Sequence, residues 1–238
     1  MVGSFLNVVI YRLPREESII FPSSHCPDCE TKLTALDLVP VLSFLLTQGR
    51  CRYCGAKISY QYPLVELLTA LSFWALYSQY QLTLQFFIYI CLVSTLIVIS
   101  LIDLKHFIIP NKITYPGIIA AFTLSFFRPQ LSYLDALLGI LLPSLFLFLL
   151  AVISRGGLGM GDVKLIAMLG GFLGLLDGFL ALFLGAMIGS VMGIILMVFS
   201  NKGLKSKLPF GLFISLGGLL MILWGQEIIN IYWQIISH

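Results

Sequence analysis

Four long apolar segments constrain the fold of this chain more than any other feature. They cover residues 82–102, 131–153, 177–199 and 208–225. Because an α-helix rises about 1.5 Å per residue, about 20 apolar residues are enough to cross the hydrocarbon core of a membrane. With 59% hydrophobic and only 11% charged residues, the chain also has too little polar surface for a soluble globule. The sequence therefore predicts a helical membrane protein.

Shorter apolar segments complete the predicted helix set, at residues 1–13, 63–79, 113–127 and 163–176. Residues 1–13 lack the basic start and the cleavage site of a secretory signal, so we interpret them as an abbreviated first transmembrane helix, unless the start is misplaced. The helix at 163–176 should be about 21 Å long and interrupted by Gly170, Gly171 and Gly174. The expected fold is an all-α polytopic membrane protein with about eight transmembrane helices.

Positive charge orients the predicted bundle, because short loops rich in Lys and Arg stay in the cytoplasm. If residues 14–62 are cytoplasmic, thirteen of the fourteen basic residues fall on that side, and Arg128 is the exception. The thirteen are Arg12, Arg15, Lys32, Arg50, Arg52, Lys57, Lys105, Lys112, Arg155, Lys164, Lys202, Lys205 and Lys207. The net charge of +3 therefore reflects topology, and no basic helix interleaved with aromatic residues indicates nucleic-acid binding.

Two aspartates are the candidate catalytic residues. Asp103 ends the third predicted helix and Asp162 begins the sixth, so both lie at the cytoplasmic face. Ionisable residues at the edge of a bilayer core are usually functional. Two neighbouring carboxyl groups share one proton, so that one can activate water while the other polarises a scissile carbonyl. Gly159 and Gly161 permit a tight turn beside Asp162.

Each aspartate also has an ordinary structural interpretation. Asp162 precedes an apolar helix and could simply cap its N-terminus. Asp103 could be an interfacial residue that pairs with Lys105. Spacing alone leaves these alternatives open beside the prediction of an aspartyl hydrolase.

Four cysteines predict a metal site in the polar segment. Cys26 and Cys29 form one Cys-x-x-Cys pair, and Cys51 and Cys54 form another. Such pairs are typical of a tetrahedral Zn²⁺ site, whereas disulfides, the alternative, are rare in the reducing cytoplasm. Four thiolates leave no open coordination position, so the predicted role is structural. Cys91 lies in the middle of an apolar helix, where we expect a small core side chain.

Two further patterns predict packing. Gly185, Gly189 and Gly193 recur every four residues and form a small-residue ridge that favours close approach of another helix. The apolar residues 38–46 are too few to span a membrane. They should either pack under the zinc site or lie at the membrane interface.

Six sequence blocks occur in order over nearly the whole chain. They are Gly3-Ser-Phe-Leu-Asn-Val-Val-Ile-Tyr-Arg-Leu-Pro14, the cysteine pairs, Tyr62-Pro-Leu-Val-Glu-Leu-Leu-Thr69, Asp103 followed by Ile109-Pro110-Asn111, Gly159-Met-Gly-Asp-Val-Lys164, and Pro209-Phe-Gly211. Together they resemble the type IV prepilin peptidases, membrane aspartyl proteases of the Gly-x-Gly-Asp type. The family cuts a short basic leader from prepilins after a glycine, on the cytoplasmic side. The resemblance implies that Asp103 and Asp162 are catalytic, supported by Gly159, Gly161 and Lys164.

The resemblance also implies a second activity. Many members methylate the new N-terminal amine with S-adenosylmethionine, although no glycine-rich signature of a soluble methyltransferase occurs in this sequence. The residues that match candidate methyl-transfer positions are Asn7, Arg12, Gly49, Arg50 and Glu66. Glu66 could bind the amine or the sulfonium. Alternatively, it is a buried carboxylate paired with Arg12 or Asn7.

The expected organisation follows from these interpretations. Residues 1–13 form the first helix, residues 14–62 a cytoplasmic zinc domain between helices 1 and 2, and residues 63–238 the membrane-embedded peptidase core. The resemblance implies a multi-pass protein of the bacterial inner membrane with its active site facing the cytoplasm. Expected partners are prepilins or pseudopilins and the lipid bilayer, in support of pilus assembly, type II secretion or competence. The sequence leaves homo-oligomerisation open.

Two other classes of function compete with this reading. Intramembrane carboxylates and broken helices also occur in transporters, so the chain could be a proton- or metal-coupled transporter. Against that, the two halves show no internal repeat and both aspartates lie toward one face. A non-enzymatic assembly scaffold would explain the zinc domain but would leave Gly159 to Asp162 without a task.

Overall fold

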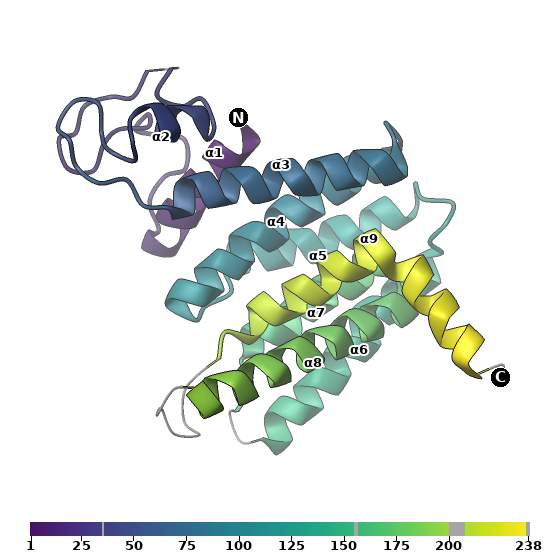
Figure 1. The fold of residues 1–238 in the computed structure, drawn as a ribbon. Helices are drawn as coiled ribbons and strands as arrows, with labels where there is room; N and C mark the ends of the chain where they lie inside the picture. The colour runs from purple at the N-terminus through teal and green to yellow at the C-terminus, as the bar shows by residue number, and fades with distance from the viewer. Residues whose placement is uncertain (35, 155–156, 200–207, 237–238) are drawn as a thin grey trace. The chain divides into compact units, whose positions relative to one another are not determined.

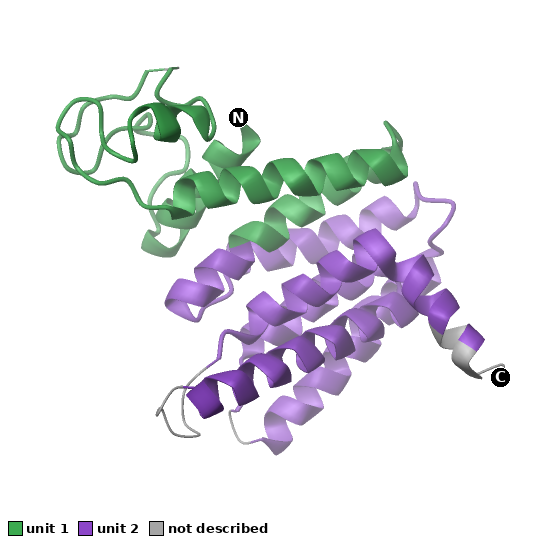
Figure 2. Ribbon diagram, in the orientation of Figure 1, with its two compact units in different colours: residues 1–98 green, residues 99–238 purple. Residues whose placement is uncertain are grey.

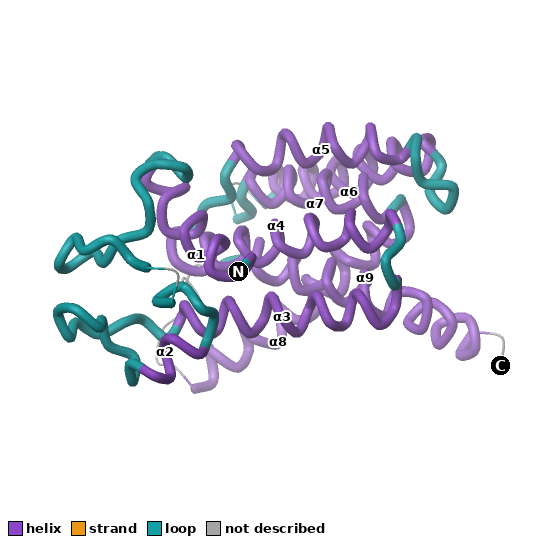
Figure 3. Tube along the Cα trace, turned by 90° about the horizontal axis from the view of Figure 1, so that it is seen from above, coloured by secondary structure: helices purple, strands orange, loops and turns teal. Residues whose placement is uncertain are grey.

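The computed structural model describes residues 1–34, 36–154, 157–199 and 208–236. Within these ranges the regular elements are helices joined by loops and turns, as Figure 1 and Figure 3 show. The chain divides into two compact units, Met1–Val98 and Ile99–His238 (Figure 2). The boundary falls inside helix α4, Leu84–His106, so Asp103 and Asp162 both belong to the second unit.

The first unit is built on two packed helices and a loop-rich segment between them. Its elements are α1 (Val2–Arg12), a 3-10 turn (Leu13–Arg15), α2 (Leu42–Leu46), α3 (Gln61–Tyr80) and the first part of α4. Helix α1 packs against α3, and the approach is close at Gly3, where a Cβ atom would lie 2.7 Å from Cα of Glu66. This contact brings the first sequence block beside the third.

Part of the apolar segment 38–46 forms the short helix α2. The ring of Phe44 packs against Tyr60, with 5.6 Å between the ring centroids. The leucines of this helix are exposed: Leu42 by 58%, Leu45 by 62% and Leu46 by 79%. The ring of Phe44 therefore anchors α2, and its leucines form an apolar outer face.

The second unit surrounds one short helix with longer ones. Besides the end of α4, its elements are α5 (Asn111–Ser125), α6 (Tyr133–Ile153), α7 (Met160–Leu173), α8 (Leu175–Phe199) and α9 (Phe210–Ile236). Helix α7 packs against α5, α6, α8 and α9. Every residue from Leu165 to Leu173 is buried. Because α7 is enclosed by protein, the residue at its first turn, Asp162, has a rigid support.

The prediction that Gly170 and Gly171 interrupt this helix is wrong. Both lie inside α7, and Gly170 meets the backbone of Gly139 in α6, where neither position has room for a Cβ atom. The glycines therefore allow close helix packing and do not break the helix. The helix does end at Gly174, whose φ of 95° lies in the region that favours glycine. The predicted end at residue 176 is thus too late.

The predicted glycine ridge on α8 is confirmed. Gly185 and Gly189 lie against Phe213 of α9, and a Cβ atom at Gly185 would lie 2.9 Å from Cα of Ile214. Helices α8 and α9 consequently pack closely beside each other (Figure 1). Helix α9 is bent at Trp224, where φ is −133°. The ridge therefore fixes the first part of α9, which begins beside Asp103.

Each of the eight segments predicted to be helical contains a helix within the described residues. Four of these helices are long and apolar enough to cross a membrane: α4, α6, α8 and the part of α9 from Phe210 to Ile231. The helical, multi-pass character of the chain is thus confirmed, and the full set of eight spans stays a prediction. Of the basic residues used to orient the bundle, Arg155, Lys202, Lys205 and Lys207 lie outside the described ranges.

The expectation for Cys91 is wrong, because its side chain is exposed on α4. In a membrane protein the outer surface is itself apolar, so an apolar residue in the middle of a helix need not face the core.

Candidate active site and metal centre

Asp103 lies in the last turn of α4 and is bound by the first turn of α9. Its side chain is 5% exposed, and its Oδ2 accepts a 3.2 Å hydrogen bond from the backbone N–H of Leu212. The backbone N–H of Gly211 also donates to this carboxylate. The first N–H groups of a helix have no partner within that helix, so the start of α9 is a natural binding site for a carboxylate. The alternative partner, Lys105, is an exposed neighbour.

Asp162 lies in the first turn of α7 and is 7% exposed. Its Oδ2 accepts a 3.1 Å hydrogen bond from the backbone N–H of Gly159. The capping role considered from the sequence is therefore present, although the N-cap position itself is Gly159. This bond uses only one carboxylate oxygen, which leaves Oδ1 available for other chemistry.

The structure brings the two aspartates together at one end of the second unit. The negative charge of Asp103 acts electrostatically on Asp162. The turns that hold them meet at a shared side chain, Ile109: a Cβ atom would lie 2.9 Å from Ile109 at Gly161 and 2.7 Å from it at Gly211. Two buried carboxyl groups in such an arrangement can share a proton.

Lys164 contacts the neighbouring helix. Its Nζ donates a 2.9 Å hydrogen bond to Oδ1 of Asn111 and lies 5.0 Å from the ring centroid of Tyr115. Both partners belong to α5. Lys164 thus ties the first turn of α7 to α5, and it supports the turn that carries Asp162 from outside.

The four predicted metal ligands lie together in the first unit. The sulfur atoms of Cys26, Cys29, Cys51 and Cys54 all lie within 4.8 Å of one another. Sγ of Cys26 and Sγ of Cys54 are 3.9 Å apart, and all four thiols are free. Four thiolates at about 2.3 Å from a tetrahedral Zn²⁺ ion would be about 3.8 Å apart. The donor set therefore fits zinc in both type and spacing.

The two cysteine pairs sit in loops of the same geometry. The N–H of Cys26 donates to the carbonyl of Thr31 at 3.0 Å, and the N–H of Cys51 donates to that of Ala56 at 2.8 Å. Antiparallel bridges close both loops, between His25 and Lys32 and between Arg50 and Lys57. These two knuckles, residues 25–32 and 50–57, thus present their sulfur atoms in the same way.

Hydrogen bonds favour the thiolate form of two of the four cysteines, Cys29 and Cys51. The Thr31 hydroxyl lies 3.3 Å from Sγ of Cys29, and this bond lowers the pKa of Cys29 to about 6. Backbone N–H groups of Cys54 and Tyr53 lower the pKa of Cys51. Such bonds orient the ligands before the metal binds.

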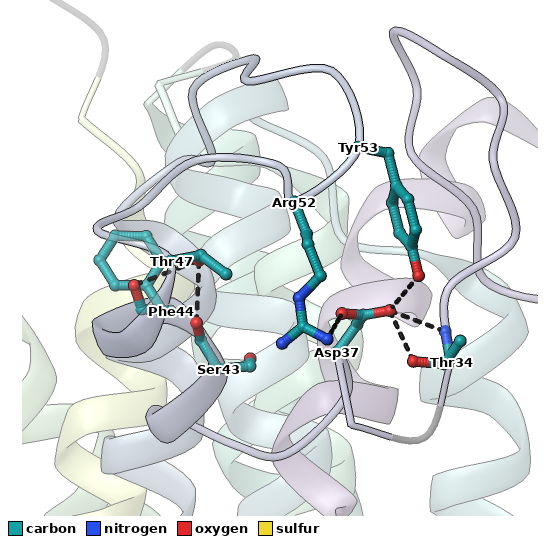
Figure 4. Close-up of polar contacts among 7 residues, drawn as sticks. All are labelled: Thr34, Asp37, Ser43, Phe44, Thr47, Arg52 and Tyr53. Carbon is teal, nitrogen blue, oxygen red and sulfur yellow. Dashed lines mark hydrogen bonds and ion pairs between the residues drawn. The ribbon is translucent and has the colours of Figure 1, made fainter.

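Asp37 links the segment that follows the first knuckle to the second knuckle, and it was not identified from the sequence (Figure 4). Its Oδ2 accepts hydrogen bonds from the backbone and hydroxyl of Thr34, at 2.9 and 2.7 Å, and from the Tyr53 hydroxyl at 2.9 Å. Arg52 lies 3.5 Å from Oδ1. The Thr34 bonds lower the pKa of Asp37. Thr34-x-x-Asp37 is a local turn pattern, but nothing in the sequence pairs it with Tyr53.

Two of the methyl-transfer candidates lie at the contact between α1 and α3. Glu66 accepts hydrogen bonds from the Ser4 hydroxyl at 2.5 Å and from the Val41 N–H at 2.7 Å. Asn7 donates to the carbonyl of Tyr62 at 3.1 Å, whereas its buried Oδ1 has no partner among the described residues. The predicted pairing of Glu66 with Arg12 or Asn7 is therefore wrong, because Glu66 binds Ser4 and Val41 instead.

The other candidates occupy separate positions. Arg12 is buried and donates a 3.0 Å hydrogen bond to the carbonyl of Ser18. Gly49 has a φ of 69° and packs beside the Phe44 ring, where a Cβ atom would lie 2.9 Å from Cζ. Arg50 is the residue that bridges to Lys57 before the second knuckle. Of the five candidates, Asn7 and Glu66 thus lie at the contact between α1 and α3. Arg12, Gly49 and Arg50 occupy other positions.

Family comparisons match both units of the chain. Residues 1–80 match the bacterial peptidase A24 N-terminal domain, and residues 90–194 match the type IV leader peptidase family. The second match contains Asp103, Ile109 and Asp162. No solved structure matches the chain at a significant level.

Named relatives support the same assignment. A prepilin leader peptidase/N-methyltransferase of Bacillus subtilis is 37% identical over 98% of this chain and 94% of its own length. A protein of the same name from Myxococcus xanthus is 40% identical over 84% of this chain and 62% of its own length. Another, from Aeromonas hydrophila, is 34% identical over 98% of this chain and 90% of its own length. Together with the family matches, these identities confirm the resemblance seen in the sequence blocks: the chain belongs to the type IV leader peptidase family.

Proposed function

We propose that this protein is an aspartic endopeptidase that removes the basic leader from prepilins or pseudopilins. The observation that carries the proposal is the convergence of Asp103 and Asp162, both buried and both held by turns that contact Ile109. The relatives bear the name prepilin leader peptidase/N-methyltransferase. Such processing would support pilus assembly, type II secretion or competence.

We assign different roles to the two carboxyl groups. Asp103 accepts hydrogen bonds from two backbone N–H groups, Gly211 and Leu212, and these bonds stabilise its ionised form. Asp162 accepts one such bond, from Gly159, and faces the charge of Asp103. Asp103 then takes a proton from the attacking water, while protonated Asp162 polarises the scissile carbonyl and protonates the leaving amine.

A second step on the cleaved product is N-methylation. The new N-terminal amine would attack the methyl group of S-adenosylmethionine, so that a C–N bond forms, the C–S bond breaks and the amine releases a proton. Glu66 is the proposed partner of the amine or the sulfonium, because among the described residues its carboxylate accepts hydrogen bonds from two neutral donors, Ser4 and Val41. The free Oδ1 of Asn7 offers a second acceptor nearby on α1.

The cysteine cluster is proposed to hold a structural Zn²⁺ ion. Cys26, Cys29, Cys51 and Cys54 would supply all four ligands, which leaves no position for a reacting water. The ion would join the two knuckles of a cytoplasmic domain, residues 14–62, which has few buried side chains of its own. Residues 1–13 would form the first transmembrane helix and residues 63–238 the peptidase core.

We further propose a multi-pass arrangement in the bacterial inner membrane, with the aspartates facing the cytoplasm. Support comes from the four apolar helices and from the basic residues on one predicted side. Eight spans would require the shorter helices α1, α3, α5 and α7 to be embedded as well. Neither the family matches nor the relatives favour the transporter alternative.

One assay tests the peptidase. Membranes containing the wild type, Asp103→Asn or Asp162→Asn are incubated with a prepilin, and leader removal is followed by electrophoresis and mass spectrometry. We expect both variants to be inserted and inactive. Cleavage at the wild-type rate by either variant would contradict the dyad. Labelled methyl from S-adenosylmethionine should appear only on the cleaved N-terminus, and complete processing without label would make the protein a peptidase alone.

A further inference from the structure

Ile109 lies in the connection between α4 and α5, six residues after Asp103 and directly before Pro110, the N-cap residue of α5. The preceding residues are exposed: Phe107 by 50% and Ile108 by 47%. Ile109 is instead partly covered and faces two glycines of other helices. Ile109 therefore packs against other helices of the second unit, whereas the two residues before it are exposed.

The first glycine is Gly161, in the turn that carries Asp162. A Cβ atom at Gly161 would lie 2.9, 3.3 and 3.4 Å from Cβ, Cγ1 and Cδ1 of Ile109. All three nearest atoms belong to this one side chain. The first turn of α7 consequently rests directly on Ile109.

The second glycine is Gly211, in the turn that holds Asp103. A Cβ atom there would lie 2.7 Å from Cδ1 of Ile109 and 3.0 Å from Oδ2 of Asp103. The N–H of the next residue, Leu212, donates to that same Oδ2. The first turn of α9 is therefore held between Ile109 and the carboxylate of Asp103.

We propose that Ile109 is a positioning residue that fixes the separation of Asp103 and Asp162 by packing between Gly161 and Gly211. The inference rests on the proposed aspartate dyad. The side chain fixes the distance between the two turns. A backbone N–H group of one turn binds Asp162, and a backbone N–H group of the other binds Asp103. The two glycines have no side chains of their own, so the side chain of Ile109 fills the contact between the turns.

The surroundings hold Ile109 itself in place. Directly after it, the carbonyl of Pro110 accepts the N–H of Thr114 at 3.2 Å, which starts α5. Asn111 is bound by Lys164 from α7 at 2.9 Å. These bonds hold the chain after Ile109, and a 2.9 Å bond from the N–H of Phe107 to the carbonyl of Asp103 holds the chain before it.

Shortening this side chain should affect the chemical step more than substrate binding. A misplacement of reacting groups by about 1 Å can lower a rate about a hundredfold. Removing an interaction that is needed only in the transition state lowers kcat and leaves KM unchanged. Ordinary core packing would instead lower thermal stability and leave the kcat of the remaining folded enzyme unchanged.

The experiment compares Ile109→Ala and Ile109→Val with the control Ile108→Ala in the full chain, purified in nanodiscs with a prepilin substrate. Ile109→Val removes Cδ1, which contacts Gly211, and retains Cβ and Cγ1, which contact Gly161. We expect kcat to fall at least about tenfold for Ile109→Ala and severalfold for Ile109→Val, with KM and melting temperature near wild type. Ile108→Ala should match the wild type.

Several results would overturn the inference. One is a kcat within twofold of wild type for both Ile109 variants, and another is a raised KM with unchanged kcat. If Ile109→Ala does not fold, Ile109→Val alone decides: a reduced kcat at unchanged melting temperature supports the inference and an unchanged kcat refutes it. Asp103→Asn is measured in parallel. Cleavage by that variant refutes the proposed dyad, whereas its inactivity beside fully active Ile109 variants refutes only the role of Ile109.

Discussion

The backbone N–H of Leu212 binds Oδ2 of Asp103 at 3.2 Å, although 109 residues separate the two in the chain. The bond joins the start of α9 to the end of α4. It places a candidate catalytic carboxylate at the positive end of a helix whose other side is fixed by the glycine ridge of α8.

Gly211→Ala is predicted to abolish most leader cleavage. The new Cβ would lie 2.7 Å from Ile109 and 3.0 Å from the Asp103 carboxylate, so the first turn of α9 must shift. We expect the cleavage rate to fall at least about tenfold, measured with a prepilin in membranes. Gly225→Ala on the same helix is the control, because there the nearest atom is the flexible end of Met221 at 3.1 Å. Equal activity of the two variants would contradict the prediction.

Zinc content should depend on the cluster cysteines alone. Cys51→Ser removes a ligand of the proposed site, so the purified variant should lose its bound zinc in elemental analysis. Cys91→Ser removes an exposed thiol from α4 and should retain zinc at the wild-type level. Zinc retained by Cys51→Ser, or zinc absent from the wild type, would refute the proposed metal centre.

Asp37→Asn is predicted to weaken the link between the second knuckle and the segment that follows the first. The Thr34 bonds place the pKa of Asp37 in the folded state below its value in the unfolded state. The ionised carboxylate therefore stabilises the folded domain at any pH above about 4. This contribution is lost only as the pH falls through the pKa of the folded state. At pH 6 to 8 the variant should release zinc to a chelator about fivefold faster than wild type. Glu17→Gln, an exposed substitution in the same segment, should not change the rate. A rate difference that vanishes at neutral pH would contradict this role.

Glu66→Gln should separate the two proposed activities. The amide keeps the size of the side chain at the Ser4 and Val41 contacts but removes the negative charge. We expect transfer of labelled methyl to fall at least about tenfold, while leader cleavage stays within twofold of wild type. Glu227→Gln, an exposed change on α9, is the charge-matched control. Unchanged methylation by Glu66→Gln would remove Glu66 from the proposed methyl-transfer site.

Helix positions and metal ligands were predictable because their signals are local. Long apolar runs placed the predicted helices, and the two Cys-x-x-Cys pairs placed four sulfur atoms that do lie together. In both cases the residues that define the feature are close in the chain or share one chemical type, so spacing alone carries the information.

Contacts between distant segments were not predictable in the same way. Ile109, Gly211 and Leu212 meet through the packing of α4, α7 and α9, and no spacing in the chain encodes that meeting. Gly170 was misinterpreted because a glycine that breaks a helix and one that admits a neighbouring helix look identical in sequence. Cys91 was misplaced because hydropathy does not separate a core-facing from a lipid-facing side.

The enclosure of α7 has a consequence for how the enzyme tolerates its surroundings. Because protein covers every residue from Leu165 to Leu173, this part of the helix that carries Asp162 has no surface exposed to lipid acyl chains. Changes in bilayer fluidity or detergent should therefore affect this carboxyl group through the helices that surround α7. Such a support would let the proposed dyad keep its geometry in membranes of differing composition.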